Sequence, residues 1–437
     1  MSLIEKLENG TATVGVVGLG YVGLPLATSF AEAGISVIGF DVDAKKVESL
    51  SNGRSYILDV SDDEVTNAFS DGTMTATVDF SRLTECDAIS VCVPTPLRKT
   101  RDPDLRYIVS ATEQIAQYLR AGQLVILEST TYPGTTIEVV APMLEKSGLK
   151  VGVDVHLVFS PERIDPGNET FTVKNTPKIV GGLTPDCNAA AEALYTKIVN
   201  RVVTVSNPTA AEMVKLLENT FRAVNIGLVN EIAIIADKLK LDVWEVIEAA
   251  ASKPFGFMPF YPGPGLGGHC IPIDPHYLSW KLRSLNYRTR FISLADDINS
   301  NMPNYVINKV SEALNQDAKA IRGARVLVLG VAYKRNITDW RESPAVPIIN
   351  GLIDRGARLD YQDNFVPSFA LDGHGHGEHL TSVELDYSRI GDYDCTLIVT
   401  DHDYFDVDQV MANARRIVDT RNLTGAAGRT DPKVVKI

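Results

Sequence analysis

Thr13-Val-Gly-Val-Val17, followed directly by Gly18-Leu-Gly20-Tyr-Val-Gly23, is the stretch that decides the fold of the N-terminal part of this chain. Residues 13–17 have the pattern of a short buried strand, and residues 24–33 have helical character after the glycine turn. A second apolar run, residues 36–40, ends at Asp41. This order of strand, glycine turn, helix, strand and acid predicts a Rossmann unit that binds a dinucleotide.

Each glycine of this unit, and its acid, has a physical task. Gly18 permits the tight turn, Gly20 lets a pyrophosphate approach the helix N-terminus, and Gly23 lets the helix pack on the strand. Asp41 lies at roughly the 20-residue spacing expected of an acid that holds ribose hydroxyls. Because a carboxylate repels a 2′-phosphate, we expect NAD rather than NADP. The three glycines alone would be a weak signal, and the prediction depends on their context.

Three further apolar strands run into polar loops. Their loops begin at Pro94-Thr95, at Glu128-Ser129-Thr130 and at Ser160-Pro-Glu162-Arg163. Ligands of open parallel sheets bind at the carboxyl ends of the strands. Each loop alone is equally typical of an ordinary turn, but three together indicate a ligand-binding edge.

The sequence becomes helical from about residue 211 to residue 240. Lys215, Asn219 and Arg222 share one face of this predicted helix, which borders a site or is a solvated face. A second long helical stretch, residues 293–317, links two domains or forms a surface for self-association.

A glycine-rich segment with one cysteine lies between these helices: Gly263-Pro-Gly-Leu-Gly267-Gly-His-Cys270-Ile-Pro-Ile-Asp274. Glycine leaves the backbone uncovered, so we expect a ligand to approach closely. A thiol in that setting suggests covalent catalysis at an electrophilic carbon.

A second α/β unit begins with residues 325–334, without the triple-glycine fingerprint. Ser343 or Glu342 is available to cap the next helix, and residues 396–399 and 416–418 read as strands. We expect residues 425–437 to be weakly ordered. The predicted fold is α/β, with two Rossmann-like, doubly wound parallel-sheet domains joined by a central long-helix region. The predicted boundaries are 1–207, 208–317 and 318–437.

Composition limits the function. The chain has 437 residues and a net charge of −13, which argues against nucleic acid and anionic membranes as partners. It contains no long apolar segment and no signal core, and its five cysteines form no CxxC pair, so we expect a cytoplasmic protein without disulfides or zinc. His374, His376 and His379 invite a metal, but such Gly/His loops are usually solvated, and we predict none.

Taken in order, these pieces resemble the UDP-glucose/GDP-mannose dehydrogenase family over essentially the whole chain. The matching motifs include 18–25, 93–96, 129–130, 160–162, Lys215 with Asn219, 265–270 with Asp274, 330–334 and 341–344. The resemblance implies an NAD-binding domain, a central helix that carries a homodimer or higher homo-oligomer contact, and a C-terminal domain for the UDP-sugar. It also implies four-electron oxidation of C6 of a hexose to a carboxylate, with two NAD.

The resemblance assigns roles to individual residues. Glu162 is the base, with Thr130 and a water; Cys270 forms a thiohemiacetal with the aldehyde; Asp274 activates water for thioester hydrolysis; Lys215 and Asn219 stabilise oxygen charge. Cofactor contacts are expected from Gly18, Gly20, Tyr21, Val22, Gly23, Asp41, Pro94, Thr95, Ser129, Thr130 and Arg341. Substrate contacts are expected from Glu162, Arg163, Lys215, Asn219, Arg222, Phe260, Tyr261, Gly267, Tyr333, Lys334 and Arg421.

Two departures narrow the substrate. UDP-glucose members carry Asn-Pro-Glu-Phe-Leu and Gly-Gly-Ser-Cys-Phe-x-Lys-Asp, whereas this chain has Arg163 after the glutamate, His269 before the cysteine and Ile273 in place of the lysine. These forms resemble the UDP-N-acetylhexosamine branch. They favour UDP-GlcNAc as the substrate over UDP-ManNAc, and UDP-glucose is the least favoured of the three. A two-electron dehydrogenase and a non-catalytic NAD-binding protein are the rival interpretations. A zinc alcohol dehydrogenase would need a Cys/His ligand set that is missing.

Overall fold

The computed structural model describes the chain except for residues 58, 99–100, 166–167, 169 and 372–378. The chain divides into two compact units, of which the first comprises residues 1–218 and 276–287 and the second residues 219–275 and 288–437. The chain passes between the units three times: within the helices α8 (Pro208–Leu239) and α10 (Asp274–Arg283), and again between residues 287 and 288. The division into three segments at residues 207 and 317 stays a prediction.

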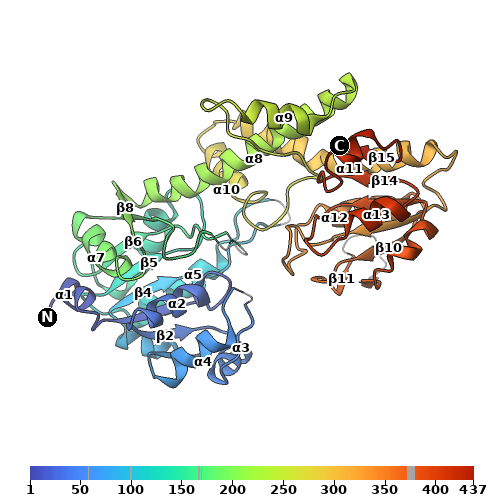
Figure 1. The fold of residues 1–437 in the computed structure, drawn as a ribbon. Helices are drawn as coiled ribbons and strands as arrows, with labels where there is room; N and C mark the ends of the chain where they lie inside the picture. Colours follow the sequence, from blue (N-terminus) through green and yellow to red (C-terminus); the bar gives the residue numbers. More distant parts are fainter. Residues whose placement is uncertain (58, 99–100, 166–167, 169, 372–378) are drawn as a thin grey trace. The chain divides into compact units, whose positions relative to one another are not determined.

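The first unit is built on an eight-stranded sheet with the order β3-β2-β1-β4-β5-β6-β7-β8 (Figure 1). Its strands are β1 (Thr13–Val17), β2 (Ser36–Phe40), β3 (Met74–Thr77), β4 (Ala88–Val91), β5 (Leu124–Leu127), β6 (His156–Phe159), β7 (Lys178–Gly182) and β8 (Val202–Val205). Neighbouring strands are parallel except β6 and β7. The order 3-2-1-4-5 around β1 confirms the predicted Rossmann-like arrangement.

Helices cover both faces of this sheet because successive strand residues point to opposite sides. Val14 and Val16 belong to a hydrophobic cluster shared with α2 and α7, whereas Val17 and Ile89 belong to a second cluster shared with α5 and α6. The helices of the unit, besides the first part of α8 and most of α10, are α1 (Leu3–Glu8), α2 (Gly23–Glu32), α3 (Ala44–Ser51), α4 (Asp62–Ser70), α5 (Arg106–Tyr118), α6 (Ala141–Leu144) and α7 (Pro185–Tyr195).

The second unit has a five-stranded parallel sheet with the order β10-β9-β13-β14-β15. Its strands are β9 (Arg325–Leu329), β10 (Arg358–Gln362), β13 (Cys395–Ile398), β14 (Ile417–Asp419) and β15 (Val434–Lys436), and β11 (Ser368–Ala370) pairs separately with β12 (His379–Thr381). Its helices, besides the rest of α8, are α9 (Val243–Ala251), α11 (Arg290–Asn315), α12 (Ala345–Asp354), α13 (Val407–Asn413) and α14 (Ala427–Thr430). This second parallel sheet confirms the predicted α/β class, and α8 and α11 are the predicted central long helices.

The C-terminal tail is more ordered than its composition indicates, so the expectation of weak order was wrong. Val434 and Val435 extend the sheet by pairing in parallel with Ile417 and Val418. Ile437 is buried in the core of the unit. A strand this short is stable only when it pairs with the edge of an existing sheet. The sequence pattern of the tail does not show that such an edge is available.

The prediction that Ser343 or Glu342 is the N-cap residue of α12 was wrong. Pro344 occupies the N-cap position of α12, and Ser343 Oγ accepts a hydrogen bond from the backbone N–H of Ala345 at 3.2 Å. Glu342 adopts a φ of 54° and provides no such cap.

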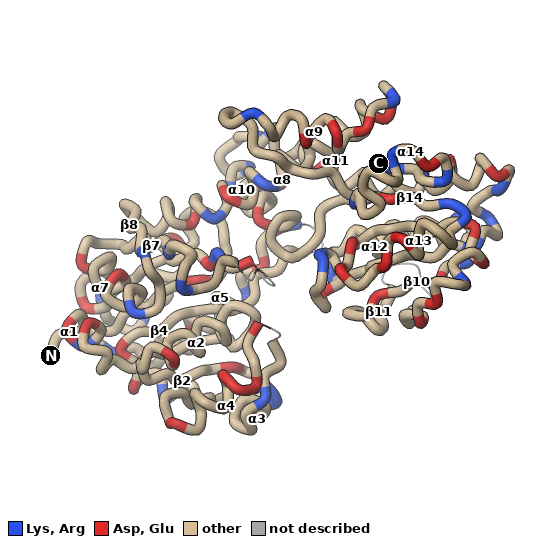
Figure 2. The backbone as a smooth tube through the Cα atoms, in the orientation of Figure 1, with Lys and Arg blue, Asp and Glu red and all other residues tan. Residues whose placement is uncertain are grey.

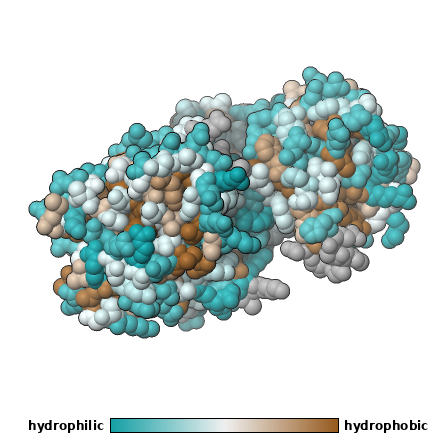
Figure 3. All heavy atoms as spheres, turned by 90° about the horizontal axis from the view of Figure 1, so that it is seen from below, coloured by the Kyte–Doolittle hydropathy of each residue, from teal (hydrophilic) through white to brown (hydrophobic). Residues whose placement is uncertain are grey.

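Within the described residues no helix is both long and apolar enough to cross a bilayer. Basic and acidic residues are interspersed along the backbone of each unit (Figure 2), and hydrophilic and hydrophobic residues are mixed on the face shown in Figure 3.

Candidate active site

The glycine turn after β1 contains two glycines fixed by packing and one that faces open space. Gly18 has a φ of 92°, and a Cβ on Gly23 would lie 1.8 Å from the carbonyl oxygen of Gly18. A Cβ on Gly20, in contrast, would meet no atom within 4 Å. Gly18 and Gly23 therefore shape the turn, and Gly20 leaves room for a ligand.

The beginning of α2 and the end of β2 complete this cradle. Val22 is the N-cap residue of α2 and provides no side-chain cap, while Tyr21 is exposed. The buried Asp41 carboxylate accepts hydrogen bonds from the backbone N–H of Leu19 and of Asp43, both at 3.0 Å, and lies 3.2 Å from Lys46 Nζ. An uncapped helix N-terminus, an uncovered glycine and a carboxylate at the adjacent strand end suit NAD.

The loops after β4 and β5 are tied to their surroundings. Ser129 Oγ donates to the carbonyl oxygen of Val93 at 2.8 Å, and the hydroxyl of Tyr277 donates to the carbonyl oxygen of Thr95 at 2.5 Å. Pro94 is exposed and Thr130 is half-buried. The predicted cofactor residues of these loops thus lie at the carboxyl edge of the first sheet.

A group of charged residues, here called the glutamate cluster, surrounds the predicted base. It consists of Glu128, Glu162, Lys178, Tyr195 and Lys215. Glu162 Oε1 accepts from the backbone N–H groups of residues 163 and 164, each at 2.7 Å, and its Oε2 lies 3.1 Å from Lys178 Nζ. Lys215 Nζ donates to the backbone carbonyl of Glu162 at 2.6 Å. The structure therefore joins two predicted catalytic residues, Glu162 and Lys215.

The cluster shifts the pKa values of its two carboxyl groups in opposite directions. Burial raises the pKa of Glu162, but Lys178 and the backbone N–H groups outweigh burial, so the pKa of Glu162 lies below its usual value. Burial dominates for Glu128 and raises its pKa. Glu162 is therefore a carboxylate at neutral pH, which is the form a base requires.

The sequence analysis did not identify three members of this cluster, Glu128, Lys178 and Tyr195, as functional residues, and Arg163 is engaged elsewhere. The sequence contains one weak signal for this cluster: Lys178 stands at the start of an otherwise apolar strand. Arg163 forms an ion pair with Glu218 at 2.7 Å and donates to the carbonyl of Pro177 at 2.6 Å. Its guanidinium holds the loop after β6 against α8.

The second unit contains the cysteine loop, residues 263–275. Of the five cysteines, Cys270 is exposed and the other four are buried. The backbone N–H of Asp274 donates to the Cys270 carbonyl at 2.8 Å. The buried Asp274 carboxylate accepts a hydrogen bond from Asn219 Nδ2 at 2.5 Å. The structure thus brings together a thiol-bearing turn, a carboxylate and an amide that the sequence placed 55 residues apart.

The glycines of this loop face protein groups, which corrects the expectation that they clear space for a ligand. A Cβ on Gly263 would lie 2.7 Å from the Arg421 guanidinium, and one on Gly267 would lie 2.7 Å from Tyr333 Cβ. Gly268, with a φ of 84°, would collide with the Tyr333 ring. The loop is glycine-rich because the C-terminal sheet region packs directly on its backbone.

Predicted substrate and cofactor residues of the second unit surround this loop. Asp339 accepts two hydrogen bonds from the Arg341 guanidinium, each at 2.8 Å, and lies 3.2 Å from His269 Nε2. Despite burial, His269 and Arg341 hold the pKa of Asp339 well below its usual value. Arg421 Nε donates to the carbonyl of Val399 at 2.9 Å, and Lys334 is half-buried.

The remaining predicted contacts lie on or beside α8 and α9. Tyr261 is 49% exposed and stacks on Trp244, with ring centroids 5.7 Å apart. Phe260 packs edge-on against Phe221. Arg222 is exposed, as a solvated helix face predicts, whereas Lys215 and Asn219 are buried.

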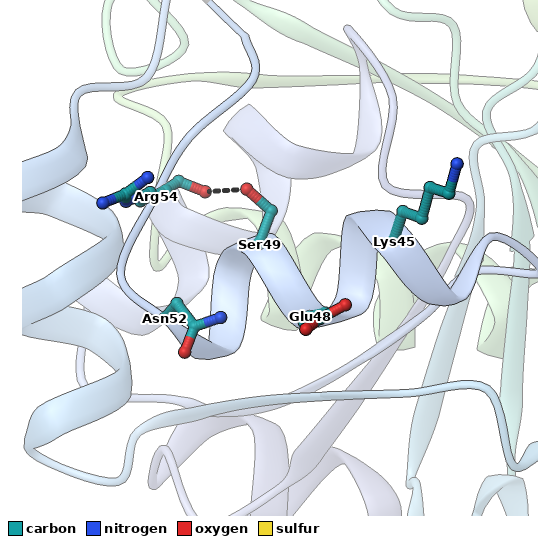
Figure 4. A pocket seen from close by; sticks show the side chains of 5 residues that line it. All are labelled: Lys45, Glu48, Ser49, Asn52 and Arg54. Carbon is teal, nitrogen blue, oxygen red and sulfur yellow. Dashed lines mark hydrogen bonds between the residues drawn. The ribbon is translucent and has the colours of Figure 1, made fainter.

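Other parts of the described structure offer no alternative centre. A surface pocket lined by polar residues of α3 and the following turn, Lys45, Glu48, Ser49, Asn52 and Arg54, contains none of the predicted site residues (Figure 4). The part of the chain that the structure describes holds no group of three acidic, cysteine or histidine residues able to bind a metal. His374 and His376 lie outside the described residues.

Comparisons with known proteins agree with the arrangement. Residues 12–199, 209–301 and 327–426 match the NAD binding, central and UDP binding domains of the UDP-glucose/GDP-mannose dehydrogenase family. A UDP-N-acetyl-D-glucosamine 6-dehydrogenase of Pseudomonas aeruginosa is 38% identical over 81% of this chain and 83% of its own length. A UDP-N-acetyl-D-mannosamine dehydrogenase of Methanococcus maripaludis is 33% identical over 93% and 92%. The structure of a UDP-D-ManNAc dehydrogenase from Pyrococcus horikoshii superposes with a TM-score of 0.87, at 32% identity over 97% of this chain and 98% of that one.

Proposed function

Because this chain belongs to the UDP-glucose/GDP-mannose dehydrogenase family, and is thus an NAD-dependent UDP-sugar dehydrogenase, we propose that it oxidises C6 of a UDP-N-acetylhexosamine to the carboxylate. UDP-GlcNAc is the favoured substrate and UDP-ManNAc the second candidate. The observation that carries the proposal is the exposed Cys270, whose turn leads into an Asp274 carboxylate bonded to Asn219.

The first oxidation needs a base for the C6 hydroxyl. Glu162 is ionised and accepts that proton, directly or through a water that Thr130 orients. Bound NAD accepts one hydride in each of the two oxidations, so two NADH leave per sugar. Gly18, Gly20 and Gly23 shape the pyrophosphate cradle, Asp41 binds ribose hydroxyls, and residues 94–95 and 129–130 line the strand ends. Arg341 remains a proposed contact at the edge of the cofactor.

The second oxidation requires that the C6 aldehyde become tetrahedral. Cys270 Sγ bonds to C6, and the aldehyde oxygen becomes the thiohemiacetal oxygen. Lys215 and Asn219 stabilise the charge on that oxygen. Loss of a hydride from C6 leaves a thioester, and Asp274 removes a proton from the water that hydrolyses it. Hydrolysis yields the carboxylate and returns the Cys270 thiol.

The nucleotide half of the substrate is assigned to the C-terminal sheet region. Lys334 and Arg421 supply positive charge for the pyrophosphate, with Arg222 as a further cation. Tyr261, stacked on Trp244, and Phe260 offer aromatic faces for the base. The Tyr333 side chain packs on the backbone of Gly267, three residues before Cys270. We therefore assign both residues to contacts with the sugar or to shaping its position.

The proposed preference for an N-acetylated sugar is supported by residues that differ from the motifs of UDP-glucose enzymes and that make contacts in the structure. His269 lies against Asp339 in the site region, and Ile273 occupies the place of a lysine typical of UDP-glucose enzymes. Arg163 is tied to Glu218 instead of presenting an apolar side chain. Relatives named for UDP-N-acetyl-D-glucosamine and UDP-N-acetyl-D-mannosamine support the same branch.

The experiment is a comparison of purified enzyme with UDP-GlcNAc, UDP-ManNAc, UDP-GalNAc and UDP-glucose in the presence of NAD. We expect the highest kcat/KM with UDP-GlcNAc and two NADH for each sugar consumed. A higher kcat/KM with UDP-glucose contradicts the branch assignment. One NADH per sugar contradicts the four-electron reaction.

We also propose a homodimer or higher homo-oligomer through α8. Phe221, Leu228 and Ile235 follow each other at seven-residue intervals on this helix and are 45%, 53% and 43% exposed. An apolar stripe of this kind is typical of a helix that packs on a partner. Sedimentation of the wild type and of the L228E variant tests it, and a monomeric wild type contradicts it.

A further inference from the structure

Three charged side chains lie side by side in the glutamate cluster of the first unit, with Lys178 and Glu128 buried and Glu162 partly buried. Lys178 Nζ lies 2.6 Å from Glu128 Oε2 and 3.1 Å from Glu162 Oε2. Lys178 is 8% exposed and Glu128 is not exposed at all. A buried ion pair is weak support for stability, since apolar residues of similar volume often serve as well. The arrangement therefore calls for a role beyond holding the fold.

Lys178 is held in place by contacts other than the one with Glu162. The hydroxyl of Tyr195, which is fully buried, donates to Glu128 Oε1 at 2.5 Å, so both oxygens of Glu128 are engaged. The ammonium also lies 5.2 Å from the centre of the Tyr195 ring. Because Lys178 begins β7, its backbone is fixed in the sheet as well.

The Glu162 carboxylate is oriented by contacts to both of its oxygens. Oε1 accepts the backbone N–H groups of Arg163 and Ile164, and Oε2 faces Lys178. From this geometry we infer that Lys178 is a positioning residue that holds Glu162 ionised and in one orientation. Glu128, fixed by Tyr195, competes for the same ammonium and so tunes the basicity of Glu162. The base role itself rests on the proposed function.

The other charged or titratable groups near Glu162 act differently. Lys215 Nζ bonds the backbone oxygen of Glu162 rather than its carboxylate. The Arg163 guanidinium is paired with Glu218. Cys92, on the neighbouring strand end, is buried, which raises its pKa and keeps it a neutral thiol. Within the described residues, Lys178 is therefore the cation in direct contact with the Glu162 carboxylate.

The direction of each effect follows from the charges. Burial raises the pKa of Glu162, and Lys178, together with the backbone N–H of Ile164 and the charge of Lys215, more than reverses this. Replacing Lys178 with methionine leaves the burial and removes the cation, so the pKa of Glu162 rises. Replacing Glu128 with glutamine removes a negative neighbour and a competitor for the ammonium, so the pKa of Glu162 falls.

The test is the pH dependence of kcat/KM for the K178M and E128Q variants. We expect the acid limb to move to higher pH by about four units in K178M, as for a buried carboxyl without a cation, and to lower pH in E128Q. We expect K178M to lose about 10- to 100-fold in kcat/KM at neutral pH and to recover at alkaline pH, within the range that base catalysis contributes. K178R, which restores the charge, should keep the wild-type limb. A uniform loss with an unmoved limb in both variants overturns the inference.

A matched control and a second readout separate this role from stability and from the proposed function. Lys309 is also buried between two carboxylates, 2.7 Å from Asp237 and 2.8 Å from Glu312, so K309M should lower stability without moving the limb. Carboxyl-13C NMR titration, with the Glu162 signal assigned from E162Q, measures the same pKa without turnover. If no UDP-sugar is oxidised, the proposed function fails while this titration still decides the role of Lys178. If K178M does not fold, E128Q decides it, and an unshifted Glu162 titration in E128Q overturns the inference.

Discussion

Asn219 Nδ2 donates a 2.5 Å hydrogen bond to Asp274 Oδ2, although 55 residues separate the two along the chain. Both side chains are buried, at 8% and 3% exposure, so the bond fixes the Asp274 carboxylate in one orientation. The N–H of Asp274 is in turn bonded to the Cys270 carbonyl. The turn after Cys270 thus fixes Asp274 relative to the thiol-bearing residue, and Asn219 of α8 holds its carboxylate, as the proposed thioester formation and hydrolysis require.

Replacing Asp274 with asparagine is expected to slow thioester hydrolysis, since an amide cannot accept the proton of the attacking water. Steady-state kcat should fall about 10²- to 10⁴-fold. NADH should appear in a burst of about two per active site, and intact-mass measurement should show a sugar adduct on Cys270. The exposed Asp408 of α13 gives a control, D408N, that should behave as wild type. Undiminished turnover of D274N contradicts the role.

Cys270 should be the first cysteine to be alkylated by iodoacetamide in the folded protein, because the other four are buried. Peptide mass mapping checks the site. Alkylation should abolish the four-electron reaction and should be slowed by the UDP-sugar. C270A should release at most one NADH per sugar, because no thiohemiacetal can form. Full activity of C270A, or modification of a buried cysteine first, is the contrary result.

Two glycines of the first turn should respond differently to alanine. G23A places a methyl 1.8 Å from the Gly18 carbonyl, so we expect a loss of about 1–3 kcal/mol or more in the free energy of unfolding. G20A meets nothing within 4 Å, so its Tm should be unchanged while its KM for NAD rises about tenfold or more. Thermal unfolding with NAD titration measures both. An unaffected KM in a folded G20A would remove Gly20 from the cofactor site.

Asp41 should set the preference for NAD over NADP. D41N keeps the side-chain shape but removes the charge that repels a 2′-phosphate, so the ratio of kcat/KM for NAD to that for NADP should fall about tenfold or more. D43N removes a charge two residues away, at the N-cap of α3, and should leave the ratio near the wild-type value. An equal change in both variants points to general charge rather than to ribose recognition.

The parts of the fold that sequence patterning predicted correctly are those with local causes. The predicted strands at residues 13–17 and 36–40 coincide with β1 and β2, and the helix predicted to begin at Leu24 is α2, which begins at Gly23. Short apolar runs and a glycine turn act over a few residues, so they can be recognised in the sequence alone. The tail was misjudged because β15 forms only by pairing with β14.

The motifs were enough to identify the family, the α/β class, the cofactor and the candidate nucleophile. The sequence by itself could not say why residues 263–268 are glycine-rich, since the Tyr333 and Arg421 side chains that demand it come from loops after β9 and β14, far along the chain. Nor could it assign Lys178, whose charge matters only because burial places it between Glu128 and Glu162. Motifs record which chemical groups are present, but the distances and the shared burial that set their pKa values arise from long-range packing, and only the tertiary structure decided those.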